Sequence, residues 1–135
     1  MIAYRLSYRL SYRWASVAHM SMSIGMISID TTDPIALGQW WAAQAGGEVV
    51  ATNDGFFVMV SLGEGAPMLG FQKVDDPTPG KNRIHLDLQT ADRVADVARL
   101  EEAGATRVGD HEIEGFAWTT LADPDGNQFC VSARH

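Results

Sequence analysis

The residues with the clearest chemical potential in this chain are His85, Asp87 and Cys130. His85 and Asp87 alternate with apolar residues along Ile84–Gln89, a period of two that predicts a strand with both polar side chains on one face. An imidazole beside a carboxylate can move protons, or the imidazole can bind a metal ion. The simpler alternative is a structural histidine that only hydrogen-bonds to Asp87 or to water.

Cys130 is the single cysteine of the chain and allows three interpretations. It could be a soft ligand for Zn or Cu together with His85, which would need a third partner. It could be a nucleophile that a neighbouring His85 activates. It could also be a small apolar filler of the protein interior. Because one cysteine cannot form an internal disulfide, we expect a reducing compartment, the cytoplasm.

The elements that must position these residues occur twice in the same order. Each half predicts a strand, a helix and three further strands, separated by glycine- and proline-containing turns. In the first half these are 23–30, 35–45, 48–52, 56–62 and 68–74. In the second half they are 84–89, 91–103, 106–112, 116–122 and 127–132.

This order predicts an α+β fold of two βαβββ modules, residues 23–74 and 82–135, joined by the polar linker 75–81. In each module the helix covers one face of the sheet, so we expect the two sheets to form an incomplete curved barrel with a concave cleft. Such a cleft is the expected place for a small molecule. Its candidate ligand-binding residues are Met26, Phe57, Met59, Trp118 and Cys130, with His85 and Asp87 as the candidate catalytic pair.

Residues 1–22 differ from the rest of the chain. They contain the basic repeat Tyr-Arg-Leu-Ser, whereas every acidic residue lies at Asp30 or later. We predict a flexible extension. A basic arm that docks on an acidic surface and a targeting segment are the alternatives, although arginines interrupt any secretory apolar stretch.

Two stretches resemble the vicinal oxygen chelate superfamily of glyoxalases, bleomycin resistance proteins and dioxygenases. They are Ile84–Leu88, at the start of the second module, and Asp123–Cys130, with its Asp-Pro-Asp-Gly-Asn turn. The resemblance implies paired βαβββ modules and, in metal-dependent members, a divalent ion held by His or Glu side chains from four strands. The corresponding positions here are Met26, Gln72, His85 and Cys130. The resemblance thus adds Gln72 to the candidate ligand-binding residues and makes it the only third partner for a metal held by His85 and Cys130. Only His85 matches, so we expect no cofactor, and a divalent metal is disfavoured.

The overall composition excludes some classes of protein but does not itself indicate a chemistry. A formal net charge of −7 disfavours nucleic acid, and no apolar run is long enough for a membrane span. We therefore expect a glyoxalase-like protein that binds a small organic ligand without a metal, as a homodimer. The alternative is a lyase or isomerase of the glyoxalase kind that uses His85 as a metal ligand or general base. The sequence does not decide whether the protein is an enzyme.

Overall fold

The structure is a computed structural model and describes residues 22–134. Most of the predicted basic extension, residues 1–21, lies outside the described part of the chain, as does His135. Within residues 22–134, no helix is long and apolar enough to cross a bilayer.

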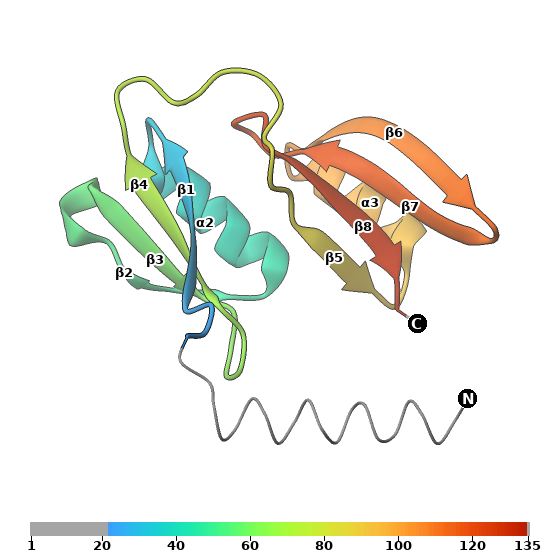
Figure 1. The fold of residues 1–135 in the computed structure, drawn as a ribbon, viewed down its shortest axis with the longest axis horizontal. Coiled ribbons are helices and arrows are strands. Elements are labelled where there is room, and N and C mark those ends of the chain that lie inside the picture. Colours follow the sequence, from blue (N-terminus) through green and yellow to red (C-terminus); the bar gives the residue numbers. More distant parts are fainter. Residues whose placement is uncertain (1–21, 135) are drawn as a thin grey trace.

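The first module is a four-stranded sheet covered on one face by a helix (Figure 1). Its sheet has the order β1-β4-β3-β2, in which β1 and β4 are parallel and the other neighbours are antiparallel. Asp33 begins the helix by accepting a hydrogen bond from the backbone of Ala36, and Gly46 ends it in the left-handed conformation. The elements are β1 (Met26–Thr31), α2 (Pro34–Ala45), β2 (Glu48–Ala51), the short 3₁₀ turn η1 (Asn53–Gly55), β3 (Phe57–Ser61) and β4 (Met68–Lys73).

The second module repeats this topology with the sheet order β5-β8-β7-β6. Asp92 caps its helix through the backbone of Ala95. The elements are β5 (Asp87–Thr90), α3 (Arg93–Glu102), β6 (Thr106–Ile113), β7 (Phe116–Ala122) and β8 (Gln128–Ala133). The predicted α+β fold of two βαβββ modules is confirmed, and the two sheets remain open rather than closing into a barrel.

One predicted strand is shorter than the sequence pattern indicates. The pattern starts it at Ile84, but β5 begins at Asp87, so His85 lies just before the strand. The side chain of Asn82 explains the difference, because its amide donates to the carbonyl oxygens of Ile84 and Gln128 at 2.7 and 3.0 Å. These contacts shape residues 82–86 irregularly and leave Ile84 81% exposed instead of packed in the core.

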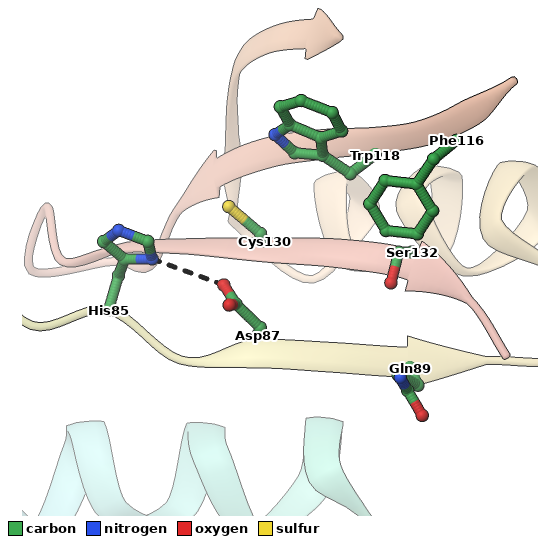
Figure 2. A pocket seen from close by; sticks show the side chains of 7 residues that line it. All are labelled: His85, Asp87, Gln89, Phe116, Trp118, Cys130 and Ser132. Carbon is green, nitrogen blue, oxygen red and sulfur yellow. Dashed lines mark hydrogen bonds and ion pairs between the residues drawn. The ribbon is translucent and has the colours of Figure 1, made fainter. Parts of the chain in front are cut away.

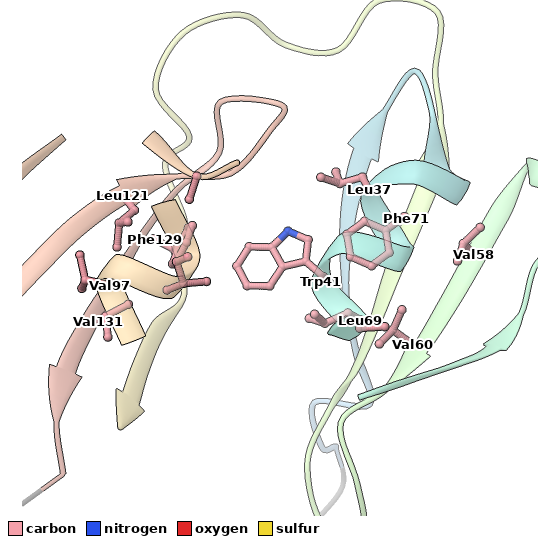
Figure 3. Packing of buried hydrophobic residues seen from close by; sticks show 13 residues of the cluster. Leu37, Trp41, Val58, Val60, Leu69, Phe71, Val97, Leu121, Phe129 and Val131 are labelled. Carbon is pink, nitrogen blue, oxygen red and sulfur yellow. The ribbon is translucent and has the colours of Figure 1, made fainter. Parts of the chain in front are cut away.

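The buried side chains of both modules form one hydrophobic cluster, and α2 lies between the two sheets (Figures 1 and 3). Trp41 of α2 makes an edge contact with Phe129 of β8, with ring centroids 5.0 Å apart. Trp40 donates to the carbonyl oxygen of Ala103, just beyond α3, at 2.9 Å. The modules are therefore joined through helix α2, and each sheet keeps one face without a covering helix.

Acid is expected to weaken the second module through Asp96 on α3. Hydrogen bonds from Thr90 and then from Arg99 hold the pKa of Asp96 below its ordinary 3.8. Because the folded-state pKa is the lower one, this stabilisation is complete above about pH 5 and is lost as the pH falls through the folded value. We expect Asp96→Asn to lower the melting temperature at neutral pH, by a difference that shrinks towards about pH 3. Circular dichroism melts across that range measure it, and a difference independent of pH would contradict it.

Candidate functional site

The open face of the second sheet carries a pocket of about 380 Å³. Its walls come from β5, β7 and β8, because alternate residues of each strand point to this face while the others enter the core. Figure 2 shows the seven side chains that line it: His85, Asp87, Gln89, Phe116, Trp118, Cys130 and Ser132.

Three of these side chains bring nitrogen, oxygen and sulfur atoms close together. Asp87 and Cys130 are direct partners across the parallel β5–β8 pair, and His85 precedes Asp87 by two residues. Nδ1 of His85 lies 3.3 Å from Oδ1 of Asp87, and one ligand atom from each of the three residues lies within 4.8 Å of the others. The His85 and Asp87 side chains are 43% and 73% exposed, so a ligand in the pocket can reach both. The predicted pairing of His85 with Asp87 is therefore present in the structure.

The segment that carries His85 is tied to β8 by hydrogen bonds. Besides its two carbonyl contacts, Asn82 accepts from the backbone N–H of Gln128 at 2.7 Å. The backbone N–H of Cys130 donates to the carbonyl of Leu86 at 2.9 Å. These bonds hold the backbone on both sides of His85 against the strand that carries Cys130, which makes Asn82 a positioning residue for the site.

The opposite wall of the pocket is aromatic. Trp118 lies beside Phe116, with ring centroids 5.7 Å apart and ring planes 31° apart. His111 of β6 also stacks on Trp118, with ring centroids 5.1 Å apart and ring planes 26° apart. The site thus combines aromatic rings on β7 with a carboxylate and an imidazole at β5, an arrangement that suits a flat ligand with polar groups at one edge.

Four predicted ligand-binding residues lie on the first module instead. Met26, Phe57, Met59 and Gln72 occupy strand positions that alternate with buried core residues, so they belong to the open face of the first sheet. A Cβ on Gly70 would come within 2.7 Å of both Met26 Sδ and Phe57 Cζ, which places these two side chains together there. None of the four lines the pocket, whereas His85, Asp87, Trp118 and Cys130 all do.

Three lining residues were missed by the sequence reasoning. Gln89 follows Asp87 by two residues, Phe116 precedes Trp118 by two, and Ser132 follows Cys130 by two. The period of two that placed the predicted residues on one face could have found all three. Asn82 gave no such signal, because its role depends on Gln128, 46 residues away in the chain.

The four positions implied for a divalent ion do not form a suitable site within the chain. Met26 offers a thioether and Gln72 an amide, and both lie on the first sheet, while His85 and Cys130 lie on the second. Hard ions such as Mn²⁺ and Mg²⁺ prefer carboxylate and other oxygen ligands. The donor set therefore does not fit the hard ion that metal-dependent relatives would hold.

Paired βαβββ modules with a pocket on an open sheet face define the class of glyoxalase, bleomycin resistance and dioxygenase proteins. The sequence profile of the glyoxalase-like domain matches residues 26–132, and the chain belongs to this family. No functionally curated protein matches the chain significantly.

Solved structures show the same fold. A glyoxalase/bleomycin resistance protein/dioxygenase family enzyme from Burkholderia phytofirmans PsJN superimposes with a TM-score of 0.71 at 19% identity, covering 83% of this chain and 98% of that one. TnmS3, an antibiotic binding protein from Streptomyces sp. CB03234, gives 0.64 at 25% identity and covers 87% and 100%. Lactoylglutathione lyase from Agrobacterium tumefaciens gives 0.63 at 19% identity and covers 84% and 95%.

Proposed function

We propose that this protein binds a small, flat organic molecule in the pocket of the second module without needing a metal ion. The observation that carries the proposal is the aromatic wall of Trp118 and Phe116 facing the polar pair His85 and Asp87 across one cavity. A ring stacked on Trp118 would keep its polar substituents within reach of these groups. The volume of about 380 Å³ is within the range of small-molecule sites.

The similarity to TnmS3 supports a binding role, since that relative is described as an antibiotic binding protein. The charge of the chain supports a neutral or cationic ligand, because the formal net charge is −7 and Asp87 lies exposed in the pocket. The thioether of Met26 and the amide of Gln72, at two of the four family ligand positions, do not suit a hard ion, which agrees with binding by stacking and hydrogen bonds.

Trp118→Ala is the variant that tests this function. A thermal-shift screen of antibiotics and small metabolites first identifies a ligand, and titration then gives its Kd. We expect Trp118→Ala to weaken binding about 30-fold or more, since a buried aromatic anchor typically contributes about 2 kcal/mol or more. Phe56→Ala is the matched control, because Phe56 is 67% exposed and lies outside the pocket. Equal affinities of the wild type and Trp118→Ala would reject the proposed site.

A second candidate function rests on the contact between His85 and Asp87. A carboxylate 3.3 Å from the imidazole can orient it as a general base, and one structural relative is a lactoylglutathione lyase. Turnover of a ligand found in the screen, lost in His85→Ala while the affinity for that ligand remains, would favour an enzyme. Binding without turnover favours the first proposal.

We also propose a cytoplasmic homodimer. The single cysteine is consistent with a reducing compartment. The open face of the first sheet carries Met26, Phe57 and Met59, all half-buried, and a second copy could cover this face or the pocket. We expect sedimentation equilibrium to give twice the chain mass of 14.7 kDa. A mass that stays monomeric at all protein concentrations would contradict the dimer.

A further inference from the structure

The donor cluster of the pocket differs from the four-strand set expected for the family. It contains one imidazole, one carboxylate and one thiol, from His85, Asp87 and Cys130, and all three belong to the second module. The sequence reasoning gave Cys130 and His85 only Gln72 as a third partner. The structure instead places Asp87 directly opposite Cys130, so the third donor is a charged oxygen from the neighbouring strand.

The spacing of these donors is close to that of a tetrahedral zinc site. Bond lengths of about 2.0–2.3 Å to nitrogen, oxygen and sulfur set the donors about 3.3–3.7 Å apart. Nδ1 of His85 and Oδ1 of Asp87 are already 3.3 Å apart, and one donor atom from each of the three residues lies within 4.8 Å of the others. Rotation of the exposed His85 and Asp87 side chains can supply the remaining adjustment, since neither is held by tight packing.

The charge and the chemical softness of the three donors both favour zinc. A thiolate at Cys130 and the carboxylate of Asp87 together neutralise a divalent cation, and a thiolate with an imidazole favours zinc over magnesium, calcium or manganese. Three protein ligands also leave a fourth coordination position for water or a ligand. From this arrangement we infer that His85, Asp87 and Cys130 form a zinc-binding site contained within the second module. This goes beyond the proposed function, in which the organic ligand is bound without an ion.

Calorimetric titration of the full chain with ZnCl₂, in a non-thiol reductant, tests the site. We expect one Zn²⁺ per chain, and no saturable binding of Mg²⁺ or Mn²⁺. Loss of an outer-shell partner alone costs a metal site about 10–100-fold, so we expect Cys130→Ser and His85→Ala to weaken the affinity by about 100-fold or more. Binding should release a proton from the thiol, measurable as heats that depend on the buffer.

Cobalt provides a readout specific to the sulfur ligand. Co²⁺ bound to the wild type should show a thiolate-to-metal absorption band, which Cys130→Ser should remove. Met26→Ala and Gln72→Ala are the matched controls, since both residues hold family ligand positions but lie on the other sheet, and they should leave zinc affinity unchanged. Unchanged affinity in Cys130→Ser, loss of affinity in either control, or no binding by the wild type would overturn the inference. Each of these outcomes leaves the Trp118 test of organic ligand binding unaffected.

Discussion

Replacing Asp123 by alanine is expected to destabilise the protein by about 3 kcal/mol or more, because one buried and several part-buried donors would lose their acceptor. Asp123 is only 3% exposed and lies in the turn before β8. Its carboxylate accepts from the backbone N–H groups of Asp125 and Asn127, both at 2.9 Å, and from the Asn127 side chain at 3.0 Å. It also accepts from Nε1 of Trp41 at 2.9 Å, so one residue both shapes the turn and connects it to helix α2.

Urea unfolding monitored by circular dichroism measures this change as a lower midpoint at a constant slope. Asp123→Asn is the matched control, because an amide keeps the shape and one acceptor oxygen of the carboxylate while losing its charge. Its loss of stability should therefore be smaller than that of Asp123→Ala. If Asp123→Ala unfolds at the same urea concentration as the wild type, the turn contributes little to the junction between the modules.

The existence of this turn could be predicted from the sequence, but its role could not. Asp-Pro-Asp-Gly is a strong local turn signal, and the turn lies where that signal indicates, between β7 and β8. The contact between Asp123 and Trp41 joins residues 82 positions apart. No local pattern reports such a pair, so the connection between the turn and the first module became visible only in the folded chain.

In the second sheet, too, the local pattern was predictive except where a long-range contact intervenes. Residues of β8 alternate as the strand period requires, since Phe129 and Val131 are buried in the core and Cys130 lines the pocket. Alternation failed at the start of β5, where Asn82 bonds to β8 and prevents the strand from beginning at Ile84. A side chain that bonds to a distant backbone thus overrides the local period.

The candidate site was predictable within a module but not across modules. The period of two correctly places Asp87 and Cys130 on one sheet face, because it depends only on strand geometry, and His85 lines the same pocket although it precedes the strand. Whether the first module contributes to the same pocket depends on how the two modules pack together, which no local pattern reports. Four residues of the first module were therefore also assigned to the cleft: Met26, Phe57, Met59 and Gln72. That packing depends on α2, which is apolar on more than one side. Gly38 lies so close to the first sheet that a Cβ there would be 2.6 Å from Val58, while Trp41 contacts Phe129 of the second module.

Trp41→Ala is accordingly expected to lower the free energy of unfolding by about 4 kcal/mol, since loss of a buried aromatic ring typically costs about 3–5 kcal/mol. Trp41 is 2% exposed and lies between the modules, in contact with Trp40 at 5.2 Å and with Phe129 (Figure 3). The variant would leave a cavity at the junction and would also remove the donor to Asp123. Thermal and urea unfolding both measure the loss.

Two further variants separate packing from hydrogen bonding at this junction. Trp41→Phe keeps most of the ring but removes Nε1, so its cost should be about 1–2 kcal/mol, and combined with Asp123→Asn it should cost less than the sum of the two single changes. Trp40→Ala is the comparison for packing, because Trp40 also contacts the second module but is only half-buried, so its cost should be smaller. If neither Trp41→Ala nor Trp40→Ala lowers the free energy of unfolding, then α2 does not join the two modules. Two separate unfolding transitions in Trp41→Ala would show that the modules fold independently once this contact is lost.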